Sequence, residues 1–200
     1  TREVIVAGST HPGEEAILLR AFEKVREKFP VSLLVLVPRH PERGRSVYEL
    51  CKGEGFSSQL LSEIQQLTPE DDILVIDRVG ELRRFYGASQ VAYIGGSLVP
   101  HGGQNPLEPL VARIPVIFGP YMSNFRDIRQ LILDVKAGVE VHSASELAKE
   151  LILLLESPTE ASRMGERGET MVRHNQGAVT RIYQLIAELL NHPASSSSGH

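Results

Sequence analysis

The chain has 200 residues, of which 42% are hydrophobic and 23% are charged, and its formal net charge is −4. These values are typical of one soluble globular domain, and the negative charge argues against a broad nucleic-acid-binding face. The one cysteine, Cys51, cannot form an internal disulfide, and the sequence shows neither a signal peptide nor an apolar run of membrane-spanning length.

The first half of the chain alternates between short apolar runs and amphipathic stretches. This pattern predicts strands at 3–7, 32–37 and 72–76, and helices at 13–29, 46–53 and 81–86. The stretch 54–71 gives a weak signal, and within it 60–67 fits either a short helix or an irregular excursion.

The second half continues the alternation and then becomes helical. We expect strands at 90–94, 115–118 and 139–141, and helices at 107–112, 124–135, 144–155, 159–173 and 178–190. The segment 191–200, which ends in SSSSGH, reads as a flexible tail or an expression scar, so residues 1–190 form the predicted domain. Strand-like residues follow Thr1 almost at once, which suggests a piece cut from a longer protein.

Strands that alternate with helices at this spacing predict an α/β fold, a Rossmann-like parallel sheet with helices on both faces. Ligands of such sheets bind beyond the carboxyl ends of the strands. The loops expected at that edge are GSTHPG (8–13), PRHPER (38–43), DRVGE (77–81), GGSLVPHGGQNPLE (95–108) and GPYMSNF (119–125).

The loop at 95–108 is the most informative of the five. Its four glycines allow positive φ angles and close approach of a ligand to the backbone. Asn105 suits a helix N-cap, Pro106 the first helical position, and Glu108 the carboxylate of a capping box. A glycine-rich turn before a helix start predicts an anion-binding concavity, although the glycines could only shape a turn and Glu108 only cap its helix. Neither GxxxxGK[ST] nor GxGxxG after the first strand is present.

Six short blocks in these loops resemble one family. They are GSTH at 8–11, LVPRHPER at 36–43, VGEL at 79–82, GGSL at 95–98, GGQNPLEP at 102–109, and GP with NF between 119 and 125. The blocks occur in the same order in the carboxyl-terminal half of 3-deoxy-D-manno-octulosonic acid (Kdo) transferases, and the resemblance covers residues 4 to 190.

This resemblance implies the carboxyl-terminal half of an inverting GT-B glycosyltransferase, which binds the donor CMP-Kdo or the product CMP. The family's amino-terminal half carries the site for the lipid A precursor, the catalytic carboxylate and an anchor to the cytoplasmic face of the bacterial inner membrane. We therefore expect a soluble chain without a catalytic residue, metal or cofactor of its own, which is inactive without its amino-terminal partner domain.

The resemblance also implies the residues that bind the donor. Those carried over by motif are Pro38, Arg39, Val79, Gly80, Glu81, Asn105, Pro106, Leu107 and Glu108. Further candidate donor contacts on the same edge are Ser9, Thr10, His11, His40, Gly96, Ser97 and Gly103. Many relatives have methionine in place of Val79, so a main-chain contact there would survive the difference better than a side-chain contact.

These roles are physically reasonable for the residue types. Glu108 could accept hydrogen bonds from vicinal ribose hydroxyls, and N–H groups near Asn105 could meet the phosphate of the departing CMP. Arg39 could add a charge-assisted contact to the phosphate or to the carboxylate of the sugar acid.

Three alternatives remain open. The chain could be a non-catalytic nucleotide-binding module or a GT-B donor domain for a UDP-sugar. It could also belong to a metal-dependent hydrolase with His11, His40 and His101 as ligands, but these residues lack HxxxH-type spacing and no cysteine accompanies them.

Overall fold

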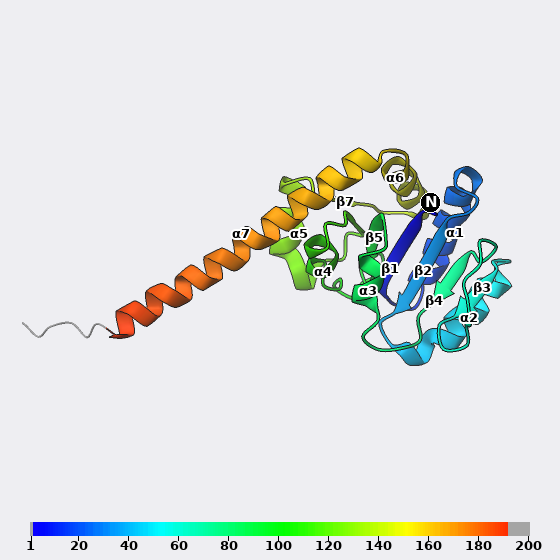
Figure 1. The fold of residues 1–200 in the computed structure, drawn as a ribbon, viewed down its shortest axis with the longest axis horizontal. Coiled ribbons are helices and arrows are strands. Elements are labelled where there is room, and N and C mark those ends of the chain that lie inside the picture. Colours follow the sequence, from blue (N-terminus) through cyan, green and yellow to red (C-terminus); the bar gives the residue numbers. More distant parts are fainter. Residues whose placement is uncertain (1, 192–200) are drawn as a thin grey trace, which may run out of the picture.

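The computed structural model describes residues 2–191, with side-chain surroundings for residues 2–175, and consists of one parallel sheet between two layers of helices (Figure 1). The strands are β1 (Val4–Thr10), β2 (Leu33–Pro38), β3 (Ser58–Leu60), β4 (Ile73–Val75), β5 (Val91–Ile94), β6 (Val116–Phe118) and β7 (Gly138–Glu140). The helices are α1 (Glu14–Lys28), α2 (Gly44–Gly53), α3 (Leu82–Tyr86), α4 (Leu107–Val111), α5 (Arg126–Asp134), α6 (Ala144–Glu156) and α7 (Pro158–Asn191). Two 3-10 turns, η1 (Pro41–Arg43) and η2 (Ser123–Phe125), precede α2 and α5.

The strand order is β3-β4-β2-β1-β5-β6-β7, and every neighbouring pair is parallel. Strand β1 pairs with β2 on one side and with β5 on the other, so the order of the strands reverses next to β1. Such a switch point leaves a crevice at the carboxyl ends of the two strands, because the following loops diverge to opposite faces of the sheet.

Each face of the sheet has its own apolar core. Helices α1, α2 and α6 pack on one face, and α3, α4 and α5 pack on the other. Helix α7 contributes to both cores, with Met164 on the first face and Met171 on the second. The predicted doubly covered parallel sheet is confirmed, because strands such as β2 and β5 are buried along their whole length.

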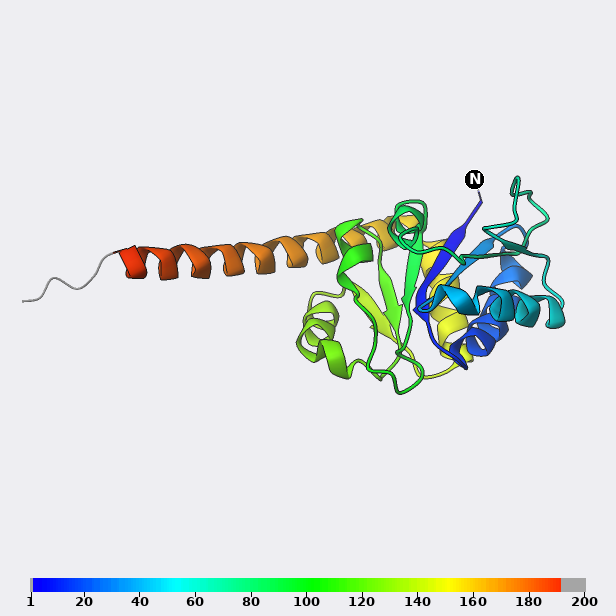
Figure 2. The same cartoon turned by 90° about the horizontal axis from the view of Figure 1, so that it is seen from below.

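Helix α7 corrects the prediction of two separate closing helices, since it runs without a break from Pro158 to Asn191. In both views it lies along one flank of the sheet, and its later turns project beyond the other elements (Figures 1 and 2). Gly177 lies in the gap between the two predicted helices, but one glycine in a helix interior costs only about 1 kcal/mol relative to alanine. The predicted tail, apart from Asn191, lies outside the described residues.

Two further boundaries differ from the prediction. The sheet has an edge strand, β3, within the weak stretch 54–71, where the short sequence SQL carries no apolar run to signal it. Strand β1 continues past Gly8 to Thr10 through a shift in register, and Ser9 within the shift has a φ of 56°. This left-handed residue lies at the crevice beside β5 and redirects the chain towards α1.

Candidate functional site

A pocket of about 200 Å³ opens at the crevice between the carboxyl ends of β1 and β5. Its lining residues are Gly8, Ser9, Arg39, Leu82, Tyr86, Ile94, Gln104, Asn105 and Glu108. We call it the switch-point pocket. It brings together four predicted donor contacts, Ser9, Arg39, Asn105 and Glu108, from three separate loops.

Beside it lies a larger groove of about 600 Å³, formed between α3, α4 and α7. The lining residues are Gly80, Leu82, Arg83, Leu107, Glu108, Val111 and Val172. This α3–α4 groove shares Leu82 and Glu108 with the switch-point pocket. Glu108 therefore lies where the two hollows meet.

Glu108 is exposed in the first turn of α4, and within the described part of the chain its carboxylate accepts no hydrogen bond. The first N–H of the helix is instead satisfied by Asn105, one residue before the N-cap, whose Oδ1 accepts a hydrogen bond of 3.0 Å from the backbone N–H of Leu107. The helix begins at Leu107, so Pro106 occupies the N-cap position and not the first helical one. The alternative that Glu108 closes a capping box finds no support, and its carboxylate is available to a ligand.

Tyr86 is a pocket residue that the sequence did not indicate. It is buried, and its hydroxyl group lies so close to Gly8 that a Cβ atom there would come within 2.1 Å. Burial, together with the negative charge of nearby Glu108, raises the pKa of the Tyr86 phenol above its ordinary value. No motif in the sequence marks Tyr86, at the end of the short helix α3, as a pocket residue, so only the fold reveals its place there.

Of the two predicted charged contacts Arg39 and Glu81, only Arg39 lines the switch-point pocket, and only Arg39 lacks an ion-pair partner among the described residues. The Arg39 backbone N–H donates to the carbonyl of Thr10 at 2.9 Å, which fixes the loop after β2, while its exposed guanidinium forms no ion pair with any described residue. Glu81 pairs with Arg84 at 3.3 Å and makes no cap bond to its own helix. Val79, between these elements in the chain, is 85% exposed.

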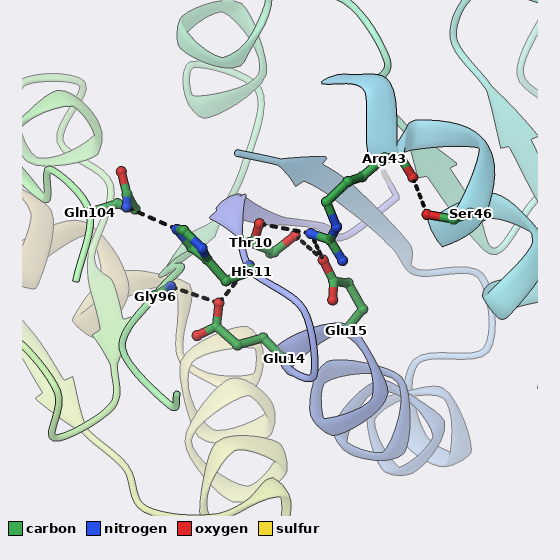
Figure 3. A network of polar contacts seen from close by, with 8 residues as sticks. All are labelled: Thr10, His11, Glu14, Glu15, Arg43, Ser46, Gly96 and Gln104. Atoms are coloured by element: carbon green, nitrogen blue, oxygen red, sulfur yellow. Dashed lines mark hydrogen bonds and ion pairs between the residues drawn. The ribbon is translucent and has the colours of Figure 1, made fainter. Parts of the chain in front are cut away.

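The glycine-rich turn after β5 differs from the prediction, because a protein carboxylate already fills it. Glu14, at the start of α1, is fully buried and accepts hydrogen bonds of 2.6–3.1 Å (Figure 3). The donors are the backbone N–H groups of His11, Gly96, Ser97 and Leu98 and the hydroxyl group of Tyr93. The backbone N–H groups of the turn face a carboxylate as expected, but that carboxylate is Glu14, so the N–H groups of Gly96, Ser97 and Leu98 already have a partner within the protein.

Sequence reasoning missed Glu14 because acidic residues are common in the first turn of any helix. Its neighbour Glu15 is buried in the same way and accepts hydrogen bonds from the Thr10 hydroxyl at 2.8 Å and from Arg43 at 2.9 Å (Figure 3). This triad ties η1 to the end of β1. The Thr10 hydroxyl group therefore already has a hydrogen-bond partner within the protein.

Ser97 is likewise fully buried, and its hydroxyl group accepts a hydrogen bond of 2.8 Å from the backbone N–H of Gly119. It connects the loop after β5 to the loop after β6. The structure thus gives Thr10 and Ser97 internal partners, whereas Ser9 remains on the pocket wall.

Comparison with known proteins identifies the family of this fold. The family model for glycosyl transferases group 1 matches residues 14–171. The chain belongs to this family. The match runs from the start of α1 into α7 and contains the loops that follow β2, β4, β5 and β6 at the carboxyl edge of the sheet.

Individual relatives of this glycosyltransferase domain have a more specific name than the family model has. The chain is 40% identical to the 3-deoxy-D-manno-octulosonic acid transferase of Haemophilus influenzae over 94% of its own length and 44% of that protein. It is 37% identical to the enzyme of the same name from Aquifex aeolicus, over 76% of this chain and 42% of that one. The chain thus spans less than half the length of these relatives.

The solved structures agree. The C-terminal CMP-Kdo binding domain of WaaA from Acinetobacter baumannii matches with a TM-score of 0.81 and 30% identity, over 86% of this chain and 89% of that one. The C-terminal domain of the group 1 glycosyltransferase LpcC from Francisella tularensis matches with a TM-score of 0.60 at 16% identity, which supports the fold alone.

The glycosyltransferase domain also carries a group of histidines beside the pocket. The rings of His11 and His101 stack with centroids 4.2 Å apart, and His40 lies edge-on to His11 at 6.4 Å. The Nε2 atoms of His11 and Gln104 are 3.0 Å apart (Figure 3). Burial, followed by the neighbouring His101, lowers the pKa of His11 below its ordinary value.

Neither a metal cluster nor a membrane-spanning helix is present among the described residues. No group of three or more His, Cys, Asp or Glu side chains there is arranged to hold a metal ion. Over the same residues, no helix combines the length and apolarity required to cross a membrane.

Proposed function

We propose that this chain is the donor-binding half of a Kdo transferase, which holds CMP-Kdo while a lipid A precursor is supplied from elsewhere in the longer protein. The observation that carries the proposal is the position of Glu108, a free carboxylate between two hollows with Arg39 lining one of them. The names of the related enzymes and of the matching CMP-Kdo binding domain support the choice of donor.

In this arrangement the ribose lies at Glu108, since a carboxylate can accept hydrogen bonds from two vicinal hydroxyl groups. The cytosine extends into the α3–α4 groove, against the loop that carries Val79, Gly80 and Glu81. The large exposure of Val79 leaves its side chain available to pack against the base.

The phosphate then lies in the switch-point pocket. Arg39 reaches it from the end of β2, and Pro38 fixes the backbone before Arg39. Negative charge accumulates on the phosphate as the bond to Kdo breaks, so a positioned guanidinium stabilises the leaving group. The remaining proposed donor contacts on this edge are Ser9, His11, His40, Gly103, Asn105, Pro106 and Leu107. Thr10, Gly96 and Ser97 support the site from within.

The catalytic base and the acceptor site are proposed to lie in the part of the longer protein that this chain does not include. That part would also hold the enzyme at the cytoplasmic face of the inner membrane. The proposal involves no metal and no cofactor.

Calorimetric titration of the chain with CMP, UMP and AMP tests the donor assignment. We expect weak binding of CMP, because one wall of the cleft is absent, and weaker binding of the other two nucleotides. Tighter binding of UMP would favour a UDP-sugar donor, and equal affinities for all three would contradict a cytidine site.

A further inference from the structure

A third hollow, of about 430 Å³, opens on the same edge of the sheet but over β5 and β6. Its lining residues are Pro100, Gly102, Pro120, Tyr121, Met122, Ser123, Arg126 and Arg129, none of which lines the other two hollows. We call it the Tyr121 pocket. The loop after β5 separates it from the switch-point pocket, because Pro100 and Gly102 face one hollow while Gln104 and Asn105 face the other.

The walls of the Tyr121 pocket are held in place by backbone hydrogen bonds. The N–H of Asn124 donates to the carbonyl of Gly102, and the N–H of Tyr121 donates to the carbonyl of Ser97, both at 2.9 Å. Gly102 has a φ of 83°, and a Cβ atom there would come within 2.5 Å of the Asn124 amide. The two loops therefore fit closely only with glycine at this position, and the pocket is a built feature of the fold.

The chemistry of the lining is that of a site for a charged sugar. Tyr121 is 47% exposed and lines the pocket together with Pro100 and Pro120, so the pocket offers an apolar wall to the C–H face of a sugar ring. Arg129 is neutralised by Glu140 at 2.5 Å. Arg126 is exposed and forms no ion pair with any residue that the structure describes. One uncompensated guanidinium beside an aromatic ring suits a carboxylate or phosphate carried by a sugar.

We propose that the Tyr121 pocket is a second subsite, in which Arg126 binds the anionic group of a sugar and Tyr121 supports its ring. The choice of sugar rests on the proposed function. The donor's sugar acid carries a carboxylate, and it would be attached to a nucleotide on the other side of the same loop. A phosphorylated sugar of the acceptor presents the same chemistry from the opposite direction.

The test begins on this chain with Arg126→Gln and with Arg20→Gln as the control, an exposed arginine on α1. Binding of CMP, freshly prepared CMP-Kdo and free Kdo is measured by calorimetry or ligand-observed NMR. If the donor's sugar acid occupies the subsite, Arg126→Gln weakens CMP-Kdo and free Kdo about tenfold and leaves CMP unchanged. Tyr121→Ala has a similar effect, Tyr121→Phe retains binding, and Arg20→Gln changes nothing.

The second arm uses a full-length transferase that contains this chain. If the subsite serves the acceptor, Arg126→Gln leaves CMP-Kdo binding intact but raises KM for the phosphorylated lipid A precursor about tenfold, with kcat unchanged. If Arg126→Gln lowers only the melting temperature of the full-length protein, and changes neither the affinity for CMP-Kdo nor the KM for the lipid A precursor, the proposal is overturned. The pocket is then a contact between domains.

The two proposals fail separately. If the wild-type chain binds no nucleotide, the proposed function is lost, but an Arg126-dependent affinity for free Kdo still supports the subsite. If CMP binds as expected and neither anionic sugar depends on Arg126, the subsite is lost and the nucleotide site remains.

Discussion

At the residue scale, the start of α4 and the proposed ribose contact depend on two different residues, Asn105 and Glu108. Asn105 accepts the first backbone N–H of α4, and Glu108 is left without a partner among the described residues. Glu108→Gln should therefore lower CMP affinity about tenfold or more, because hydrogen bonds to a charged group contribute about 1.5–3 kcal/mol. The melting temperature without ligand should hardly change.

Calorimetry and thermal unfolding on the same samples separate the two effects. Glu23→Gln, on the exposed side of α1, is the matched control and should alter neither quantity. Lost stability with intact CMP affinity would show that Glu108 is structural.

His11 should give the domain a measurable dependence on pH. Its pKa is lowered in the folded chain, mainly by burial and then by His101, while Glu14 opposes this shift and His40 and Arg43 add to it. The unfolded chain therefore binds more protons in the window between the lowered pKa and the ordinary value of about 6.5. This contribution to stability is complete above that ordinary value and is lost as the pH falls through the lowered pKa.

The measurement is urea unfolding at several pH values between about 7.5 and 5, where His titrates, in the wild type and in His11→Gln. The wild type should lose more stability towards low pH than the variant does. Parallel pH profiles would show that His11 does not carry this dependence.

At the scale of elements, Glu14 joins α1 to the loop after β5. Its buried carboxylate accepts hydrogen bonds from the backbone N–H groups of Gly96, Ser97 and Leu98. In Glu14→Gln an NH₂ group would replace one acceptor oxygen and face backbone donors, so unfolding free energy should fall by about 3 kcal/mol. Urea unfolding tests this change, and a loss as small as that of Glu23→Gln would contradict the role of Glu14.

The sequence predicted most elements because their patterns were local. Apolar runs marked strands such as β2 and β5, and amphipathic spacing marked α1 and α6. Strand β3 was missed because its three residues pair only at the sheet edge, a tertiary interaction without a local signal. The break predicted in α7 shows the reverse error, since the helix continues through residues 174–177, between the two predicted helices.

The site was predictable in outline and not in detail. The expectation that the loops meet at the carboxyl edge of the sheet, together with the family motifs, indicated Arg39, Asn105 and Glu108. The fold brings these three residues to one pocket. The occupation of the glycine turn by Glu14 depends on contacts across more than 80 residues of sequence. No periodicity or spacing rule reports such a contact.

At the scale of the whole molecule, the chain holds one side of a proposed two-part active site. Mixed with CMP-Kdo and a lipid A precursor, it should transfer no sugar, because the proposed base and acceptor site lie outside it. A transfer assay on the purified chain measures this directly. Turnover that rises with the amount of chain, and persists through further purification, would contradict the proposal that the base and the acceptor site lie outside this chain.

The most direct test of the account is the location of CMP on the domain. Titration of a ¹⁵N-labelled sample should shift the backbone amides of Arg39, Gly80, Leu107 and Glu108 together, with one common affinity, because these residues surround the two joined hollows. The amides of Gly53 and Lys149, on α2 and α6, should not move. Shifts centred on α2 or α6, with the amides around Glu108 unchanged, would contradict the central claim that this edge of the sheet binds the nucleotide.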